Sequence, residues 1–144
     1  MTIEVRAPDP AGPPPDYCCA VLVDADGAFL LERRPTTKSH APGRLTCFGG
    51  RREPGEEPDV CILRELTEEL GATPAVGPPE LALHVDGALI AWFYVGDGDL
   101  EPTLESGVEL VRLPPGRLDH PDLSTWHRPV LETWISRRTG SART

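Results

Sequence analysis

Three glutamates, Glu65, Glu68 and Glu69, stand at positions i, i+3 and i+4 of one segment of this 144-residue chain. On an α-helix with 3.6 residues per turn, all three carboxylates project from one face. Like charges at this spacing destabilise an isolated helix by roughly 0.2–0.5 kcal/mol per pair. A cluster that faces a cleft therefore needs a positive partner, most simply a hard divalent cation with oxygen ligands. The alternative is a solvated acidic helix face, which is the commoner meaning of such a spacing.

The glutamates belong to a longer pattern that runs from Gly50 to Ala72. This segment resembles the signature of the Nudix hydrolases, G-x5-E-x7-R-E-U-x-E-E-x-G-U, in which U is an aliphatic residue. Seven fixed positions of the signature are in register: Gly50, Glu56, Arg64, Glu65, Glu68, Glu69 and Gly71. The departures are Ala72, where the family prefers a larger aliphatic residue, and Phe48, where a proline often precedes the Gly-Gly pair. Neither departure touches a charged position.

The Nudix resemblance implies both a fold and a reaction. The fold is an α/β/α sandwich around a mixed β-sheet, which also suits strands interspersed with two helices. The reaction is hydrolysis of the pyrophosphate bond of a nucleoside diphosphate linked to another group, with Mg²⁺ or Mn²⁺ as cofactor. The implied metal ligands are Glu65, Glu68, Glu69 and the carbonyl of Gly49. Such ions lower the pKa of bound water and neutralise charge on the leaving phosphate, so we expect water to attack phosphorus directly.

Four further signature residues are expected to support this site. By the resemblance, Glu56 and Arg64 form an ion pair that holds the loop on the helix and orients the ligands. Glycine allows backbone geometries that are closed to other residues, which suits Gly50 beside the site. Gly71 suits the position just past the last turn of a helix. We therefore assign these four residues to structural support of the Nudix loop.

A carboxylate from a loop outside the signature often joins the site in this family. Glu105, between strands expected to end near residue 95 and to begin near residue 108, is the first candidate, followed by Glu101 and Glu109. For each of them a plain surface position is the alternative. A glutamate has to take the proton of the attacking water, and either Glu68 or Glu105 fits that role. The expected catalytic residues are therefore Glu65, Glu68, Glu69 and Glu105.

Arginines lie on the segments that lead to the signature. A guanidinium fork can grip phosphate oxygens, and we expect Arg33, Arg34 and Arg51 to bind substrate. Arg44 and Arg52 lie on the same segments. An ordinary surface position is an equally good interpretation for any one of them.

Length and charge limit the class of protein. With 144 residues and a hydrophobic content of 39%, the chain fits one globular domain. Its net charge of −9 disfavours non-specific binding to nucleic acid, which depends on neutralising phosphates with Lys and Arg. Bound divalent metal supplies the positive charge that the composition lacks. No apolar run approaches the ~20 residues of a membrane span and no leader pattern is present, so we expect a soluble, cytoplasmic protein that binds no membrane.

Cysteines and most aromatic residues are expected in the core. The four cysteines, which lack paired metal-ligand spacing, are interpreted as small hydrophobic residues of the core: Cys18, Cys19, Cys47 and Cys61. Trp92 and Tyr94 fall on one face of an expected strand and Phe93 on the other. Core packing is the default interpretation for both sets, and stacking of one set on a nucleobase is the alternative.

Turn residues and apolar periodicity divide the chain into an extended arm over 1–16, a single Nudix hydrolase domain over 17–138 and a tail over 139–144. An edge strand is expected at 3–6. The other expected strands cover 17–23, 28–33, 45–48, 81–85, 88–95 and 108–113, with hairpin turns at 24–27 and 86–87.

Two helices are expected. The first begins at Pro58 and ends just before Gly71, and its core-facing stripe consists of Ile62, Leu63, Leu66 and Leu70. The second covers 125–138, with one apolar side made of Trp126, Val130, Leu131 and Trp134.

The sequence leaves the identity of the substrate open. The candidates are an oxidised or ordinary nucleoside triphosphate, a nucleotide sugar such as ADP-ribose, a dinucleoside polyphosphate and coenzyme A. A different class of function is a Nudix-type module that senses a nucleotide without turning it over; such domains usually lose signature carboxylates, and here all four are present. The resemblance leaves both a monomer and a homodimer open.

Overall fold

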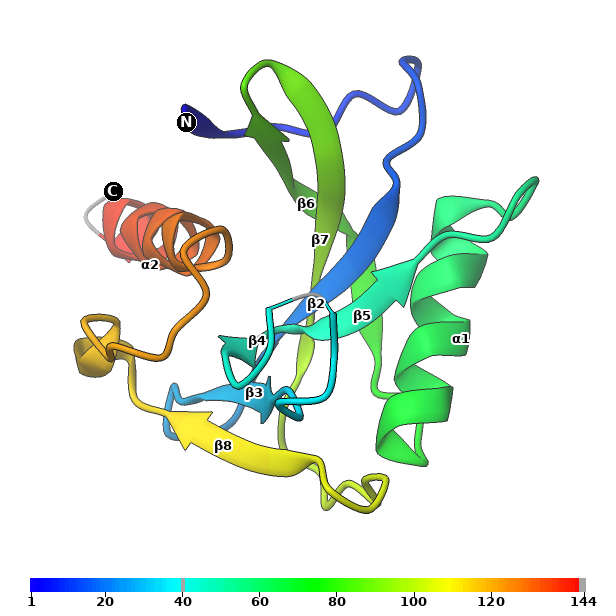
Figure 1. The fold of residues 1–144 in the computed structure, drawn as a ribbon. Helices are drawn as coiled ribbons and strands as arrows, with labels where there is room; N and C mark the ends of the chain where they lie inside the picture. The colour runs from blue at the N-terminus through cyan, green and yellow to red at the C-terminus, as the bar shows by residue number, and fades with distance from the viewer. Residues whose placement is uncertain (40, 143–144) are drawn as a thin grey trace.

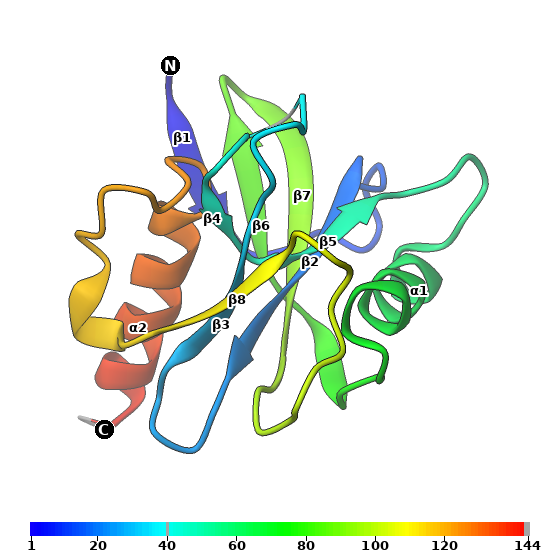
Figure 2. The same cartoon turned by 60° about the horizontal axis from the view of Figure 1, so that its bottom comes forward.

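A mixed β-sheet lies between two α-helices, with α1 on one face and α2 on the other (Figure 1; Figure 2). The computed structural model describes residues 1–39 and 41–142, and the sheet has eight strands within these residues. The strands are β1 (Ile3–Arg6), β2 (Tyr17–Val23), β3 (Phe29–Arg33), β4 (Leu45–Thr46), β5 (Phe48–Arg51), β6 (Val76–Val85), β7 (Ala88–Asp97) and β8 (Glu109–Leu113). The helices are α1 (Pro58–Leu70) and α2 (Arg128–Ala142), with a 3₁₀ turn at Pro115–Arg117. This is the α/β/α sandwich that the sequence predicted.

Strand β2 is the centre of the sheet. It pairs in parallel with β7 along its whole length, and the sheet continues from β7 to β6 and the edge strand β1. On its other side β2 pairs with β5 over Tyr17–Ala20 and with β3 only at Leu22 and Val23. Strand β3 in turn pairs with β4 and β8. The sheet therefore divides beside β2, and this division shapes the space in which the site lies.

The segment predicted as one strand over 45–48 is two short strands. Leu45 and Thr46 pair with β3, whereas Phe48 begins the pairing with β2. Gly49 and Gly50 are consequently residues of β5 rather than of a loop that follows a strand. Gly49 has a φ of 146°, and a Cβ atom there would collide with the backbone of β2. Only glycine fits so close to the neighbouring strand.

Helix α1 has the ends that the sequence predicted. Pro58 begins it, and the Gly71 N–H donates to the Thr67 carbonyl at 3.1 Å from a left-handed C-cap position. Its buried face consists of Cys61, Ile62, Leu66 and Leu70. Burial of a large aliphatic side chain in this stripe contributes about 1.5–3 kcal/mol.

The prediction that Leu63 belongs to the core stripe of α1 is wrong. Its side chain is 43% exposed. At 3.6 residues per turn, Leu63 shares the outer face with Val60 and Thr67, three and four residues away. Cys61 takes the core position instead.

Alternate residues of β2 face the two helices. Cys19 and Val21 belong to the cluster that contains α2 residues Val130 and Leu131, whereas Cys18 belongs to the cluster under α1. All four cysteines are buried and free, as predicted. Burial raises the pKa of the Cys47 thiol to about 12, so it is protonated at neutral pH.

The second helix begins later and ends later than predicted. Residues 125–127 form a turn, in which the Ser124 Oγ accepts hydrogen bonds from the N–H groups of Trp126 and His127 at 3.3 Å. Helix α2 then starts at Arg128 and continues through Ala142, so the predicted tail is helical as far as that residue. Residues 143–144 lie outside the described part. Trp134 packs edge-on against Phe29, with ring centroids 5.7 Å apart.

The hairpin β6–β7 turns at Asp86-Gly87, as predicted, and both strands are longer than the sequence indicated. Trp92, Phe93 and Tyr94 are 6%, 0% and 1% exposed. Core packing of both aromatic sets is therefore confirmed, and neither set offers a ring for stacking on a nucleobase. Of the described helices, none is long and apolar enough to cross a membrane.

Candidate active site

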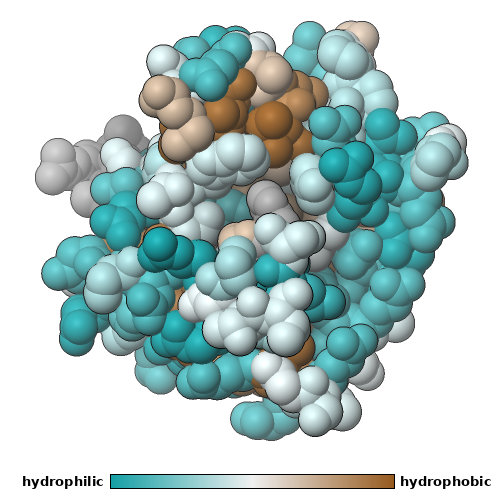
Figure 3. Space-filling view, in the orientation of Figure 1, coloured by the Kyte–Doolittle hydropathy of each residue, from teal (hydrophilic) through white to brown (hydrophobic). Residues whose placement is uncertain are grey.

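A cavity of about 550 Å³ opens where the sheet divides. One end is acidic and holds Glu65 and Glu69 beside Gly49 and Gly50. The other end is largely apolar; Figure 3 shows apolar side chains gathered near the end of the β6–β7 hairpin on an otherwise mostly hydrophilic face. The apolar end is lined by Leu83, Ile90, Ala91 and Trp126. The cavity thus offers polar and apolar walls of the kind found in small-molecule sites.

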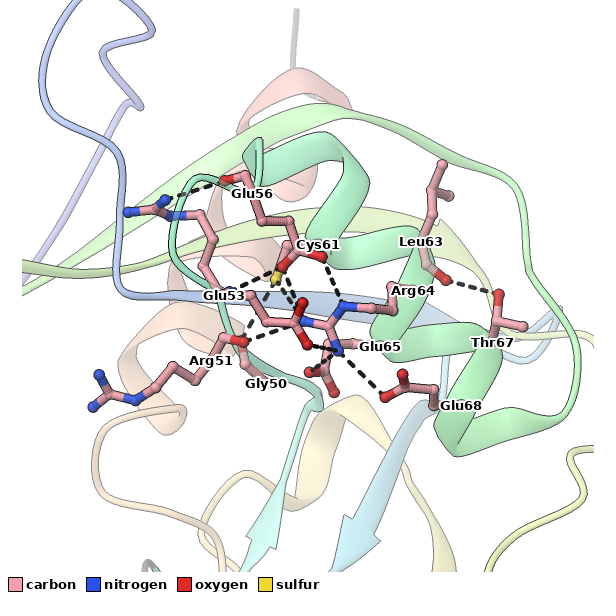
Figure 4. A network of polar contacts seen from close by, with 11 residues as sticks. Gly50, Arg51, Glu53, Glu56, Cys61, Leu63, Arg64, Glu65, Thr67 and Glu68 are labelled. Carbon is pink, nitrogen blue, oxygen red and sulfur yellow. Dashed lines mark hydrogen bonds and ion pairs between the residues drawn. The ribbon is translucent and has the colours of Figure 1, made fainter.

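Arg64 is the centre of a network that fastens the Nudix loop to α1 (Figure 4). Its Nε and Nη2 donate to the two carboxylate oxygens of Glu56 at 2.7 and 2.9 Å. Its Nη1 donates to Glu65 at 2.9 Å and to Glu68 at 3.3 Å, and its Nη2 also donates to the Arg51 carbonyl at 3.3 Å. The predicted ion pair between Glu56 and Arg64 is therefore present.

The Glu56 carboxylate is strongly stabilised in its ionised form. It accepts hydrogen bonds from Arg64 and from the Glu53 N–H, the latter at 3.0 Å. These contacts, the one with Arg64 first, lower the pKa of Glu56 to about 2. The loop is also held from the other side, because Arg52 donates to the Glu56 carbonyl at 3.1 Å and to the Pro15 carbonyl at 2.9 Å.

Glu65 lies directly against the backbone of β5. A Cβ atom at Gly50 would overlap the Glu65 carboxyl group, so glycine at this position is what lets that group sit against the strand. Burial raises the pKa of Glu65, and the hydrogen bond from Arg64 opposes that rise.

Glu69 is the more deeply placed of the two cavity carboxyl groups. It accepts a hydrogen bond from the Gly49 N–H at 2.8 Å. Burial raises the pKa of Glu69 well above its ordinary value, and the nearby Glu32 carboxylate raises it further. A buried carboxyl group beside a second one is a strained arrangement for two negative charges, and a cation would relieve it.

Glu32 is a site residue that the sequence reasoning missed. It lies on β3, is 6% exposed, and shares a hydrogen bond with Glu69. Arg34 donates to Glu32 at 3.0 Å and Thr46 donates to the same oxygen at 3.5 Å. An acidic residue inside an apolar strand is the one sequence feature that could have indicated its role, because charged residues are seldom buried without a partner.

The other predicted carboxylates lie outside the cavity. Glu68 is bound to Arg64, and its side chain is 58% exposed. Glu105 and Glu101 are exposed in the connection before β8, and Glu109 pairs with Arg33 at 3.4 Å. None of these four residues lines the cavity. The structure therefore brings Glu65, Glu69 and Gly49 together and leaves Glu68 and Glu105 apart from them.

The arginines separate into two groups. Arg34, Arg44 and Arg51 line the cavity. Arg51 donates to the Tyr17 hydroxyl at 3.0 Å and its guanidinium lies 4.9 Å from the centre of the Tyr17 ring. Arg33 is instead bound to Asp122 at 2.9 Å and to Glu109, and does not line the cavity.

The donor set at the acidic end suits a hard cation. Carboxylate and backbone carbonyl oxygens are the ligands that Mg²⁺ and Mn²⁺ prefer. The crowding of Glu32, Glu65 and Glu69 fits a centre of positive charge between them. Across residues 1–39 and 41–142, however, no three His, Cys, Asp or Glu side chains form a ready-made metal site. Binding of an ion would require the glutamate side chains to turn away from their present partners.

The signature and the fold are both found in known proteins. A family model described as the NUDIX domain matches residues 13–134. The chain belongs to the NUDIX family. The Nudix resemblance of the sequence is thereby confirmed, and the two-helix sandwich is the fold of its solved relatives.

Two curated relatives of this Nudix protein match it locally. A CTP pyrophosphohydrolase of Escherichia coli (strain K12) is 40% identical over 58 residues, which cover 40% of this chain and 42% of the relative. A nucleoside triphosphatase NudI of Escherichia coli O1:K1 / APEC is 40% identical over 50 residues, which cover 35% and 36%. The chain thus spans less than half the length of these curated relatives.

Solved Nudix structures match over most of the chain. A MutT protein from Methanosarcina mazei Go1 superposes with a TM-score of 0.70 at 20% identity and covers 90% of this chain and 99% of that protein. The Escherichia coli ORF135 protein gives a TM-score of 0.63 at 26% identity, with coverages of 86% and 90%. At this level of identity the likeness to the MutT protein establishes the fold alone.

Proposed function

We propose that this Nudix protein is a Mg²⁺- or Mn²⁺-dependent pyrophosphohydrolase that cleaves the pyrophosphate bond of a nucleoside diphosphate linked to another group. The observation that carries the proposal is the convergence of signature carboxyl groups Glu65 and Glu69 on one cavity whose other walls hold Arg34, Arg44 and Arg51. Acidic groups for a cation and guanidinium groups for phosphate oxygens then face the same space.

The residues at the acidic end of the cavity would bind the metal and orient the phosphates of the substrate. Glu65, Glu69 and the Gly49 carbonyl would hold the metal, which when bound polarises phosphate oxygens and lowers the pKa of water. Arg64 and Glu56 keep the loop on α1, so that Gly50 leaves room for the Glu65 carboxyl group. Arg34, held by the buried Glu32, offers its guanidinium group to a phosphate.

A glutamate must remove the proton from the attacking water. We propose Glu68 for this step because it stands on the same face of α1 as Glu65, and its exposed side chain can rotate toward the cavity. Glu105 is the alternative, and it would require movement of the connection before β8. The water would then attack phosphorus directly, as the Nudix signature implies; the two cysteines of the cavity lining, Cys19 and Cys47, have pKa values raised by burial and are poor nucleophiles.

Nucleoside triphosphates are the substrate class that we propose first. The apolar end of the cavity, with Leu83, Ile90 and Ala91, suits a flat base, and the arginine wall suits several phosphates. Two relatives with local matches are named as a CTP pyrophosphohydrolase and a nucleoside triphosphatase, which supports the same class.

The direct test is a nucleotide panel with Mg²⁺ and Mn²⁺, in which release of pyrophosphate, phosphate and mononucleotide is measured. The panel contains ordinary and oxidised nucleoside triphosphates, ADP-ribose, a dinucleoside polyphosphate and coenzyme A. We expect turnover with nucleoside triphosphates and release of mononucleotide. Binding of a nucleotide without turnover would instead support a sensor module, and the four intact signature carboxylates make that outcome the less expected one.

A further inference from the structure

One row of paired residues crosses four strands of the sheet along the active-site cavity. Arg51 of β5 is paired with Tyr17 of β2. Tyr17 is in turn paired with Ala91 of β7, and Ala91 with Leu83 of β6. All four residues line the cavity, so the row leads from an arginine to the apolar end. Tyr17 therefore lies at the boundary between the charged and the apolar part of the cavity.

Tyr17 contacts the guanidinium group of Arg51 in two ways. The Arg51 Nη2 donates to the Tyr17 hydroxyl at 3.0 Å, and the guanidinium carbon lies 4.9 Å from the centre of the Tyr17 ring. The hydroxyl fixes one nitrogen of the group and the ring restricts its plane. A long arginine side chain loses rotamer freedom when it binds a ligand. Because Tyr17 already restricts Arg51 in the unliganded protein, part of that entropy cost is removed from the binding step.

The contacts with Tyr17 leave the positive charge of Arg51 uncompensated. Among residues 1–39 and 41–142, no carboxylate forms an ion pair with Arg51. Figure 4 shows its guanidinium group pointing away from the carboxylates around Arg64. Arg34, by contrast, is ion-paired with the buried Glu32 at 3.0 Å. A neutral hydroxyl and a ring thus orient Arg51 and leave its charge available to an anion.

We propose that Tyr17 is a positioning residue, which holds Arg51 for the phosphate groups of the substrate. A guanidinium group has further N–H donors besides the one that Tyr17 accepts, and these can bind two phosphate oxygens at once. The inference rests on the proposed function, since it concerns the phosphates of the same substrate. It adds a role for a tyrosine that has no charge and lies outside the Nudix signature.

The test measures phosphate binding apart from turnover. Its probe is inorganic imidotriphosphate, which carries phosphate groups and no base and whose bridging nitrogens resist hydrolysis. The Kd of this probe is measured by calorimetric titration in the presence of Mg²⁺, and KM and kcat are measured with the best nucleotide of the panel. Tyr17→Phe removes the hydroxyl and keeps the ring, Tyr17→Leu removes both, and Arg51→Ala removes the guanidinium group.

We expect Arg51→Ala to raise the Kd of imidotriphosphate at least about tenfold, and Tyr17→Phe to raise it about threefold. Tyr17→Leu should lie between these two values. The KM of the nucleotide should rise in the same order, while kcat stays within about twofold. In the Arg51→Ala protein, a further Tyr17→Phe substitution should leave the Kd unchanged, because the hydroxyl then has no guanidinium group to hold.

The other tyrosine of the chain gives a matched control. The Tyr94 hydroxyl donates to Asp59 at 2.6 Å, and Tyr94 does not line the cavity. Tyr94→Phe should therefore lower the melting temperature and leave the Kd of imidotriphosphate unchanged. A merely structural role of Tyr17 would give the same result as this control.

Four results would overturn the proposal. The first is an unchanged Kd in both Tyr17 variants, and the second is an additive effect of Tyr17→Phe and Arg51→Ala. The third is a nucleotide KM that rises in Arg51→Ala at an unchanged Kd of imidotriphosphate, which would assign Arg51 to the base. The fourth is a wild type that does not bind imidotriphosphate up to about 10 mM. If coupled loss of binding is found in a protein that turns over no nucleotide, the hydrolysis proposal fails and the positioning of Arg51 by Tyr17 stands.

Discussion

Glu69 shows how a residue can be placed for chemistry at the expense of stability. Its carboxyl group is buried beside Glu32. The hydrogen bond that it accepts from the Gly49 N–H offsets part of the free-energy cost of this burial. Its ordinary pKa is 4.5, and the folded protein holds the proton to a higher pH. At pH values between those two pKa values, the Glu69 carboxyl group is ionised in the unfolded chain and protonated in the folded protein. The stability that Glu69 contributes is therefore complete below about pH 4.5 and declines as the pH rises.

Glu69→Gln should consequently give an enzyme that is less active and, without metal, more stable at alkaline pH. We expect kcat to fall roughly a hundredfold, because a charge-stabilising contact is lost. The melting temperature of the chelator-treated variant should exceed that of the wild type at pH 8 and approach it at pH 4. Glu132→Gln, at an exposed position of α2, is the control. A variant within threefold of wild-type activity would show that Glu69 is not a ligand.

The arginines allow a matched pair of substitutions. Arg34 lines the cavity and Arg33, its neighbour in sequence, does not. Arg34→Ala should raise KM about tenfold, since a hydrogen bond to a charged group is worth roughly 1.5–3 kcal/mol. Arg33→Ala should leave KM within threefold and lower the melting temperature, because Asp122 loses a partner that holds its pKa low. Steady-state kinetics and thermal unfolding of both variants test this prediction. Equal effects of the two substitutions on KM would contradict the assignment of Arg34, and not Arg33, to substrate binding.

Much of this residue-level picture followed from the sequence, and the part that did not has a physical cause. The Nudix resemblance predicted the Glu56–Arg64 pair, and local spacing predicted the place of Gly71 at the end of the helix. Glu32 could not be predicted in the same way. Its partner Glu69 is 37 residues away, and only the course of β3 past α1 brings the two together.

At the scale of elements, the Nudix loop and α1 behave as one unit. Arg64 joins the loop at Glu56 to the carboxyl groups of Glu65 and Glu68 on the helix. Arg64→Ala should therefore lower the melting temperature and kcat together, because Glu56 loses its partner and the loop its anchor. Differential scanning calorimetry and kinetics on the same preparation measure both. Lost activity at an unchanged melting temperature would indicate a direct catalytic role for Arg64.

The contribution of the Glu56–Arg64 ion pair to the stability of the fold depends on pH. The pKa of Glu56 is lowered to about 2 in the folded protein, from an ordinary value of 4.5. Its stabilising contribution is present above that ordinary value and is lost as the pH falls toward 2. Glu56→Gln should accordingly flatten the acid limb of the stability curve. An acid limb identical to the wild type would contradict this assignment.

Elements were easiest to predict where a turn and an apolar period agree. The hairpins at 24–27 and 86–87 and the helix from Pro58 are of this kind. The division of 45–51 into β4 and β5 escaped prediction, because it depends on a change of partner from β3 to β2 at Cys47. The late start of α2 has a local cause, because Pro129 has no N–H group to donate to the carbonyl of Thr125, so the regular run of helical hydrogen bonds begins later.

For the whole molecule, the proposed metal should matter for the reaction and not for the fold. The core lies on either side of the sheet and the carboxyl groups lie at a cavity, so their loss of a cation leaves the packing unchanged. Excess chelator should lower kcat/KM by at least about a hundredfold, in keeping with several kcal/mol of charge stabilisation. The far-ultraviolet circular dichroism should stay the same, and Mg²⁺ should restore activity. Undiminished hydrolysis in chelator would exclude the metal mechanism.

The net charge of −9 makes the metal important for binding as well. A nucleotide brings further negative charge to an acidic molecule, and the arginines at the cavity are the local positive groups that face it. Removal of Mg²⁺ should therefore weaken nucleotide binding to an inactive variant that keeps the proposed ligands, such as Glu68→Gln, although less than it weakens turnover of the wild type. Calorimetric titration with a nucleoside triphosphate gives the first quantity and kinetics the second.

The arrangement of the whole site also predicts which bond of the substrate is broken and which atom the water attacks. The cavity joins carboxyl groups for a cation to arginines for phosphates, an arrangement that suits direct attack of metal-activated water on phosphorus, and its buried cysteines are poor nucleophiles. Hydrolysis in ¹⁸O-labelled water should place one label on a phosphate of one product and none on the nucleoside, as mass spectrometry would show. Phosphate monoesters should be poor substrates, because they lack the second phosphate that the site can hold. Preference for a monoester, or a trapped phospho-enzyme, would mean that the Nudix reaction is wrong for this chain.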